Sequence, residues 1–294
     1  MEEQEKSAFE KFHDKNYKLL LLIPLIILIL SIAYIGYFYS ENNDFVHRDI
    51  SLTGGTSITV YDQIDIVDLE NALSDDLVDL NIREIYDLVT REQKAVIIET
   101  KTEGEQTRQV IQNYLGYELT IENSSFEFTG SALGESFYRQ LLIAILFAFL
   151  FMAIVVFIIF RTLIPSLAVV LSAFANIVMT LAVIDFLGIS LSSAGIVAFL
   201  MLIGYSVDTD ILLTTRILKR KEWSLNERIF GAFKTGMTMT LTSLLAIILA
   251  LIVVKSFSVV LTQIFTVLVI GLSFDILNTW VTNVSILKWY VEKK

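Results

Sequence analysis

Long uninterrupted apolar runs dominate this chain and limit what it can fold into. The first run covers residues 18–38, and from Tyr138 onward the sequence is apolar almost to its end. A helix needs about 20 apolar residues to cross a bilayer core of roughly 30 Å. Hydrophobic residues make up 54% of the 294 residues and the mean hydropathy is +0.65, which argues against an ordinary soluble enzyme.

Short breaks divide the apolar tail into five predicted helices, at about 139–160, 164–187, 189–213, 230–254 and 259–287. We interpret the first run as a retained span, because it is too long and its leader too mixed in charge for a signal peptide. The prediction is a multi-span α-helical membrane protein with six transmembrane helices. Its parts are a cytoplasmic segment 1–17, helix 1 at 18–39, an extracytoplasmic α+β domain at 40–137, a five-helix bundle at 138–287 and a cytoplasmic tail at 288–294.

The basic residues of the short loops predict the orientation, because cytoplasmic loops carry an excess of Lys and Arg. With the N-terminus inside, Lys255 is the one basic residue of the outer short loops. The inner short segments carry nine: Arg161, Arg216, Lys219, Arg220, Lys221, Arg228, Lys288, Lys293 and Lys294. We therefore expect a multi-pass protein of the cytoplasmic membrane with both termini inside and residues 40–137 outside.

The polar segment between the first and second spans has the pattern of a small folded domain. Predicted strands at 51–61, 82–89, 93–99 and 119–130 and helices at 65–78 and 104–114 give the order β-α-β-β-α-β, which suggests a ferredoxin-like sandwich. Residues 40–138 hold 20 acidic and 6 basic side chains. The acidic surface either keeps the domain soluble or binds basic peptide segments that emerge on the outer side of the membrane. Gly54-Gly55 lacks the following Lys-Ser/Thr of a phosphate loop and indicates a turn or bulge.

Composition also limits the chemistry. The chain has 0 cysteines, which excludes thiol catalysis and cysteine-based zinc sites. With only 2 histidines, His-rich metal sites and most Ser-His-Asp arrangements are improbable. The formal charge of −10 argues against a nucleic-acid partner. We expect no cofactor, no metal and no catalytic residues, and hence a protein that is not an enzyme.

Four acidic residues fall within the predicted spans: Asp185, Asp208, Asp210 and Asp275. An ionisable side chain inside a span costs roughly 2.5–3.5 kcal/mol on insertion scales. Asp185 lies at the outer end of its helix, where it is expected to reach the interface. Asp208 and Asp210 lie about 200° apart around one helix, so one is expected to face the bundle and the other an aqueous edge.

Polar stripes on the neighbouring spans accompany these acids. In the fifth span a small, hydroxyl-bearing stripe recurs every three or four residues: Gly231, Thr235, Thr238, Thr242, Ala246 and Ala250. A similar stripe in the sixth span contains Gly271, Asp275, Asn278, Thr282 and Ser285. Lys234 lies where it could neutralise Asp208 or Asp210. The stripes serve either close helix packing or a polar track for protons, with Asp208, Asp210 and Asp275 as proton-relay candidates.

An intramembrane aspartyl protease also needs two carboxylates in adjacent spans. Asp208 and Asp275 meet that requirement crudely, but the Gly-x-Gly-Asp signature of such proteases is missing: the chain reads Gly204-Tyr205-Ser206-Val207-Asp208. A Ser-His hydrolase site within the spans has even less support, because His13 and His47 lie outside them.

Five segments together resemble the SecF family, part of the SecD/SecF protein-export membrane proteins, in its archaeal form. The resemblance covers nearly the whole chain and is strongest in the fourth-span run Gly204-Tyr205-Ser206-Val207-Asp208, which a basic loop follows. The matching segments are 52–56 with Gly54, Gly55 and Thr56; 129–135 with Gly130 and Gly134; 203–212 with Arg216; 234–238; and 274–280.

The resemblance implies a function. SecF belongs to the proton-driven resistance-nodulation-division superfamily, pairs with SecD in a twelve-span assembly, and associates with the Sec protein-conducting channel to draw preproteins outward. The acid of the fourth-span motif is the family's candidate proton carrier, and Asp208 or Asp210 matches it. Bacterial SecF usually reads Asn-Asp-Thr there, which would place its acid opposite Thr209. Bacterial SecF also carries an arginine at the position of Thr235.

Our hypothesis is therefore an accessory, non-enzymatic subunit of protein export. Its expected partners are a SecD-like membrane protein, the Sec channel and the translocating preprotein. One alternative is half of a proton-driven exporter of small molecules or lipids from the same superfamily, although such a half would need a second external domain. Another is a passive scaffold, for which no intramembrane carboxylate matters.

Overall fold

The computed structural model describes residues 16–87, 90–219 and 223–293. It confirms six helices long and apolar enough to cross a membrane, within Asn16–Asn42, Ser131–Phe160, Leu163–Phe186, Ser193–Lys219, Leu225–Val254 and Val259–Glu292. The described part of the first span contains α2 (Leu22–Asn42), and the next four spans are α6, α7, α8 and α9. Residues 1–15 of the predicted cytoplasmic segment, 88–89, Arg220, Lys221 and Lys294 lie outside the described residues.

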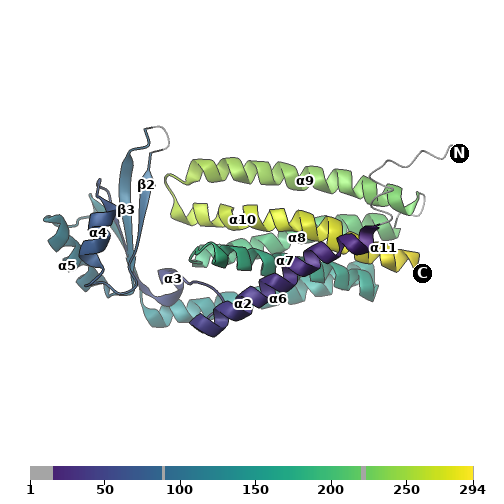
Figure 1. The fold of residues 1–294 in the computed structure, drawn as a ribbon, viewed down its shortest axis with the longest axis horizontal. Coiled ribbons are helices and arrows are strands. Elements are labelled where there is room, and N and C mark those ends of the chain that lie inside the picture. Colours follow the sequence, from purple (N-terminus) through teal and green to yellow (C-terminus); the bar gives the residue numbers. More distant parts are fainter. Residues whose placement is uncertain (1–15, 88–89, 220–222, 294) are drawn as a thin grey trace.

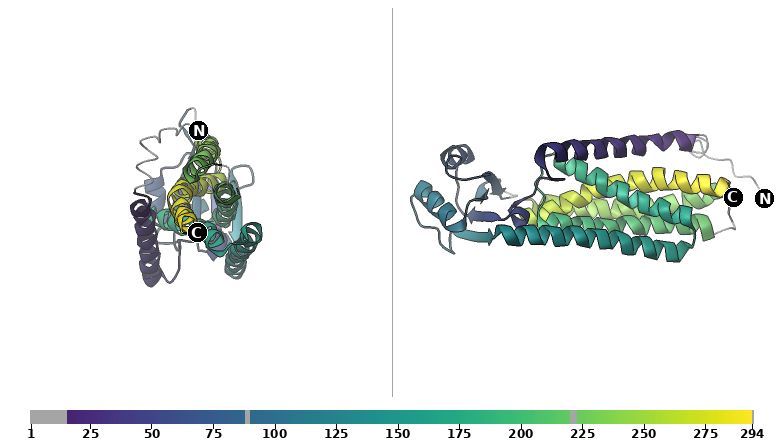
Figure 2. Two further views of the ribbon diagram at one scale, coloured as in Figure 1. Left: turned by 90° about the vertical axis from the view of Figure 1, so that its right-hand side faces the viewer. Right: turned by 90° about the horizontal axis from the view of Figure 1, so that it is seen from below.

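The sixth span is built from three consecutive pieces. α10 (Val259–Leu277) leads into a π-helical segment, η1 (Asn278–Asn283), and then into α11 (Val284–Glu292). The six spans form one elongated bundle, with a small domain at the end opposite α11 (Figures 1 and 2).

The small domain has the predicted βαββαβ order. Its elements are β1 (Gly55–Val60), α4 (Ile66–Leu73), β2 (Asn81–Tyr86), β3 (Gln93–Thr100), α5 (Gly104–Leu115) and β4 (Ser124–Thr129). The strands lie in the order β2-β3-β1-β4 with antiparallel neighbours, which is the ferredoxin-like arrangement. One face packs Ile58, Ile98, Leu69 and Ile111 into a core under α4 and α5.

Several predicted boundaries were wrong, and a capping side chain explains two of them. Residues 50–53 form a short helix, α3 (Ile50–Thr53), instead of the start of a strand, because the Asp49 side chain accepts the Ser51 N–H and caps it. α6 begins at Ser131, seven residues before the predicted bundle boundary at 138. α9 begins at Leu225, where Ser224 and Glu227 form a capping box.

The junction between domain and bundle is tightly packed. Gly54 has φ +82°, and a Cβ there would lie 2.4 Å from the Ser131 Cα. A Cβ on Gly134 would lie 2.8 Å from the Gly54 nitrogen. These glycines allow α3 to approach the first turns of α6, a contact that side chains would prevent.

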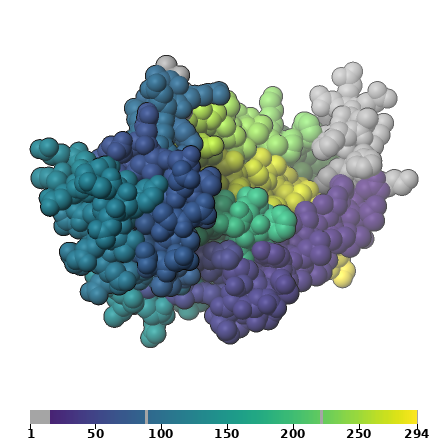
Figure 3. Space-filling view, turned by 60° about the vertical axis from the view of Figure 1, so that its left-hand side comes forward, coloured from purple at the N-terminus to yellow at the C-terminus, as the bar shows by residue number. Residues whose placement is uncertain are grey.

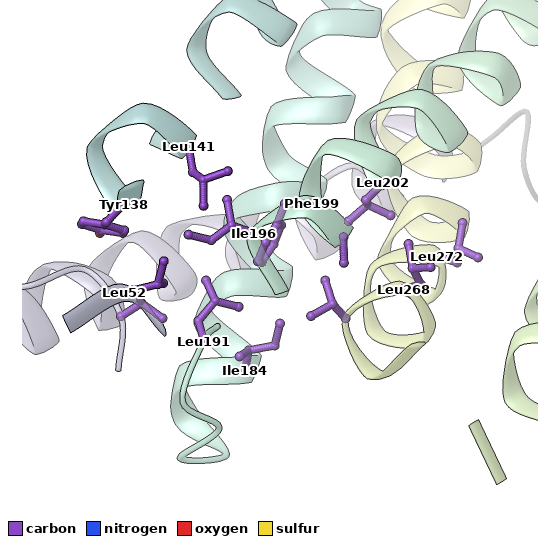
Figure 4. Packing of buried hydrophobic residues seen from close by; sticks show 13 residues of the cluster. Leu52, Tyr138, Leu141, Ile184, Leu191, Ile196, Phe199, Leu202, Leu268 and Leu272 are labelled. Atoms are coloured by element: carbon purple, nitrogen blue, oxygen red, sulfur yellow. The ribbon is translucent and has the colours of Figure 1, made fainter. Parts of the chain in front are cut away.

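The strand-like segment before α3 is held by the loop between α7 and α8. The Asp49 N–H donates to the Leu191 carbonyl at 3.1 Å, and the Leu191 N–H donates to the His47 carbonyl at 2.6 Å. Leu52 and Leu191 enter the same apolar cluster as Ile196 and Phe199 of α8 (Figure 4). The junction is therefore continuous with the core of the bundle.

The second face of the sheet looks toward the bundle, and Figure 3 shows the domain standing against the helices. A cleft of about 420 Å³ lies between Ser57, Thr59 and Glu127 of the sheet and Phe257 and Gln263 near the start of α10. Thus α4 and α5 cover the outward face, and the inward face remains polar.

Candidate functional site

Two carboxyl groups meet inside the bundle where α8 packs against the sixth span. Asp210 of α8 has no exposed surface and Asp275 of α10 is 1% exposed. The Asn283 Nδ2 donates to Asp210 Oδ1 at 2.8 Å, and the Thr279 hydroxyl donates to Asp275 Oδ1 at 3.5 Å. The two side chains lie within electrostatic range of one another. The structure thus brings together two of the three predicted relay candidates.

Hydroxyl and amide groups surround the pair. Ser172 of α7 and Thr279 lie beside Asp210, whereas Ser206 and Thr209 of α8 lie beside Asp275. Within the described residues, no basic side chain contributes to the surroundings of either carboxyl group. The arrangement is a polar cluster of acids, alcohols and amides rather than a buried ion pair.

Many polar atoms of this region lack a hydrogen-bond partner among the described residues. They are Asp210 Oδ2, Asp275 Oδ2, Asn283 Oδ1, Ser206 Oγ, Ser172 Oγ, Thr214 Oγ1 and both amide atoms of Asn176. Buried polar atoms are normally paired with protein or water, because leaving one unpaired costs about 1–3 kcal/mol. The cluster therefore holds more hydrogen-bonding atoms than the described residues pair with one another.

The π-helical segment η1 shapes the cluster. Asn278, Thr279 and Asn283 are fully buried within or at the end of it. A π-bulge adds a residue to one turn and is frequent at functional sites. Asn278 points toward α7, where its Nδ2 lies 3.5 Å from Met179 Sδ. The predicted stripe of the sixth span is therefore buried, including Thr282 and Ser285.

The third candidate, Asp208, lies elsewhere. Its side chain is exposed on the outer surface of α8, together with Gly204 and Tyr205, whereas Ser206 between them is buried. Lys234 is exposed on α9 and forms no ion pair with Asp208 or Asp210 among the described contacts. The predicted neutralisation of Asp208 or Asp210 by Lys234 is thus not seen among the described residues.

The hydroxyl stripe of α9 faces outward. Thr238 and Thr242 are exposed and donate to carbonyls of their own helix. Thr235 instead accepts a hydrogen bond from Arg216 Nη2 at 2.9 Å, and Arg216 Nη1 donates to the Gly231 carbonyl. Arg216 therefore connects α8 to α9.

The glycine motifs of the external segment serve the junction. Gly54 and Gly134 approach each other, Gly55 packs its Cα against the Thr100 carbonyl, and Gly130 precedes α6 as its N-cap residue. Thr56 is fully buried and its hydroxyl donates to the Thr102 carbonyl at 2.8 Å. These residues position the domain and hold no ligand-binding group.

Asp185 was expected to reach the interface, and this expectation was wrong. The side chain is 2% exposed, because the segment after the first span covers it and the His47 N–H donates to its Oδ1 at 3.1 Å. A carboxylate at a helix end is buried here by a chain segment 138 residues away in sequence, which local patterning does not reveal.

Sequence reasoning missed Asn283, Thr279, Thr209 and Ser172 as members of the cluster. A signal was present for two of them, since Thr279 and Asn283 follow Asp275 at steps of four residues. Ser172 had no such signal, because only the packing of α7 brings it to Asp210.

Comparisons with known proteins agree with this architecture. Residues 109–293 match the family described as "Protein export membrane protein SecD/SecF, C-terminal". A Methanocaldococcus jannaschii protein named "Protein-export membrane protein SecF" is 42% identical over 284 residues, covering 94% of this chain and 96% of the relative. The protein of the same name from Pyrococcus furiosus is 35% identical and covers 98% and 96% of the two chains.

A solved structure shares the fold. The crystal structure of SecDF, titled a translocon-associated membrane protein, from Thermus thermophilus aligns with a TM-score of 0.75 and 17% sequence identity. The alignment covers 98% of this chain and 39% of that chain. The fold of this chain thus matches about two fifths of that longer chain.

Proposed function

Because the chain belongs to the SecD/SecF family of protein-export membrane proteins, we propose that it acts as the SecF subunit of Sec-dependent export. In this function it pairs with a SecD-like protein, associates with the Sec channel and promotes movement of preproteins across the cytoplasmic membrane. The similarity of SecF relatives over nearly the whole chain carries the proposal. The role is one of an accessory subunit without catalysis.

The exposed surface of α8 supports a protein partner within the membrane. Asp208 is exposed there beside Gly204 and Tyr205, and α9 exposes Thr238. A carboxylate facing lipid costs roughly 2.5–3.5 kcal/mol on insertion scales, and small residues favour close helix contact. We place the SecD-like partner on this surface, where it would cover Asp208.

The Asp210–Asp275 cluster supports coupling to the proton gradient. Chains of intramembrane acids are typical of proton relays in pumps and transporters. In the described residues both carboxyl groups are nine-tenths or more buried and neither faces a basic partner. Neighbouring hydroxyl and amide groups provide alternative hydrogen-bond partners when a proton is gained or lost. We therefore assign the relay to Asp210 and Asp275, and the partner contact to Asp208.

The orientation belongs to the same proposal. The inner short segments carry the basic excess, so the domain lies outside the cell and the end bearing α11 lies in the cytoplasm. The domain would meet the preprotein as it leaves the channel.

The first experiment is affinity purification of the tagged chain from its native membranes in mild detergent, followed by mass spectrometry. Recovery of a SecD-like protein supports the proposal. Recovery of the chain alone, or of an efflux partner, contradicts it and favours a small-molecule exporter.

A second experiment separates the two roles. Asp210→Asn should lower export at unchanged membrane abundance and unchanged recovery of the partner, whereas Asp208→Leu should lower recovery of the partner. Equal export by wild type and Asp210→Asn would remove the relay.

Cross-linking locates the partner surface, and the natural chain has 0 cysteines. A cysteine at Tyr205, which is 42% exposed, should cross-link to the partner, whereas one at Phe174, which is 47% exposed on α7, should not. The reverse pattern would place the partner elsewhere.

A further inference from the structure

A pocket opens at the end of the bundle that carries α11. It has a volume of about 480 Å³ and lies between the end of α6, the start of α7, the end of α8, the first turn of α9, and α11. Its polar lining comes from Thr162, Lys219, Arg228 and Tyr290, and Phe160 and Val291 form an apolar wall. Among the described residues that line it, none is acidic.

Two polar atoms at the pocket lack a partner in the described part of the chain. Thr162 Oγ1 and Arg228 Nε are both buried and unpaired, although Arg228 Nη1 donates to the Ile217 carbonyl at 2.5 Å. Thr162 is the N-cap residue of α7, but its side chain makes no capping hydrogen bond. A hydroxyl and a guanidinium N–H are thus left for a group that accepts hydrogen bonds and carries negative charge.

The position of the pocket limits the source of that group. α6 and α9 have 30 residues each, a length of about 45 Å, which exceeds a hydrocarbon core of roughly 30 Å. Their ends therefore reach the headgroup layer. Basic pockets between helices at that depth suit phosphate-bearing lipid headgroups, and the apolar wall suits the adjoining acyl chain.

We propose that this pocket binds the phosphate of an anionic phospholipid. Arg228 and Lys219 would supply the positive charge, the Thr162 hydroxyl would complete the contact, and Phe160 and Val291 would pack against the chain. The proposal does not depend on the function in export or on which side of the membrane the pocket lies.

The test is native mass spectrometry of the full chain with phosphatidylglycerol, with diacylglycerol, which lacks the phosphate, or with soluble glycerol phosphate. We expect phosphatidylglycerol to be retained about tenfold more strongly than diacylglycerol, which has no phosphate to accept these hydrogen bonds, since a hydrogen bond to a charged group is worth at least that factor. Thr162→Val, which keeps the side-chain shape, and Lys219→Gln should each reduce this preference severalfold.

Lys293→Gln is the matched control, because it removes a basic charge at the same end of the bundle but outside the pocket lining. It should keep the preference. Loss of preference in this control to the same extent as in Lys219→Gln would show a general surface charge and overturn the site. Equal retention of both lipids, or a preference unaffected by Thr162→Val and Lys219→Gln, would also overturn it. Binding of glycerol phosphate as strong as that of the lipid would keep the phosphate site and assign it to a soluble ligand.

Discussion

Asp208 and Asp210 lie two residues apart on α8 and face opposite surroundings: Asp210 is fully buried and accepts a hydrogen bond from Asn283, whereas Asp208 is exposed on the outer surface of the helix. The turn of about 200° between them separates an internal polar cluster from an external contact surface. The two aspartates of this short segment of α8 thus belong to two different environments.

The hydrogen bond between Asn283 and Asp210 should be worth a measurable part of the stability. Asn283→Leu leaves the Asp210 Oδ1 without its donor and should lower the free energy of unfolding by about 1–3 kcal/mol. Replacing both residues by leucine removes both polar groups, so the double variant should lose less than the sum of the two single variants. Denaturant unfolding of the purified chain in one detergent measures this cycle, and strictly additive losses would show that the two side chains do not interact.

Gly54→Ala should destabilise the junction. Gly54 has φ +82° and ψ 154°, a region essentially restricted to glycine, and the new Cβ would meet the Ser131 backbone at 2.4 Å. Gly116→Ala is the control, because Gly116 has φ +77° but open space around it, and it should cost only about 1–2 kcal/mol. In thermal unfolding, the melting temperature of Gly54→Ala should lie well below that of Gly116→Ala. Equal melting temperatures would mean that the junction accommodates the added Cβ without loss of stability.

The connection that Arg216 makes between α8 and α9 should not survive replacement by lysine. Arg216 donates to both the Gly231 carbonyl and the Thr235 hydroxyl, and a lysine ammonium lacks the planar fork that reaches two acceptors. Arg216→Lys should cost about 1.5–3 kcal/mol, and Thr235→Val, which removes one acceptor, should cost less. Unfolding in detergent compares the two, and a larger loss for Thr235→Val would contradict the assignment.

Glu99 should make the external domain sensitive to pH. Burial raises the pKa of the Glu99 carboxyl above its ordinary value; the paired Arg83 opposes this rise, and the charge of Asp49 adds to it. The folded domain therefore holds the Glu99 proton more tightly than the unfolded chain does. The protonated carboxyl thus contributes most to the free energy of unfolding below the pKa of the unfolded chain. This contribution is lost as the pH rises through the pKa of the folded domain.

Thermal unfolding from about pH 4 to 7, around the ordinary pKa of Glu, should show wild type losing stability relative to Glu99→Gln as the pH rises. Glu127→Gln, the same charge change at an exposed position of β4, serves as the control. Wild-type and Glu99→Gln curves that stay parallel would contradict the prediction.

The spans could be predicted from the sequence because the thickness of a bilayer sets their length, and few polar residues interrupt them. The βαββαβ order could be predicted for a similar reason, since Ile58, Ile98 and Leu69 recur at the periods of strands and helices. Boundaries were less accurate where a capping side chain decided them, as Asp49 does for α3 and Ser224 for α9.

The side of α8 that each aspartate faces could not be predicted. Periodicity shows that Asp208 and Asp210 diverge, but the choice between them depends on where Asn283 and Ser172 arrive from other helices. The stripe on α9 shows the same limit. A second face of small residues, Ala232, Gly236 and Thr240, is the buried one, and the two faces have similar composition. The π-helical turn at Asn278 depends on packing and has no local signature.

The chain enters and leaves the external sheet at one place, since Gly55 of β1 is paired with Thr129 of β4. A tilt of the sheet about this junction, toward or away from the helices, would change the distance between the sheet and the bundle. Here the gap is the cleft of about 420 Å³ between the polar face of the sheet and the start of α10. Any such tilt would therefore change the width of the cleft, and a distance measured between one label on β4 and one on α10 would follow it.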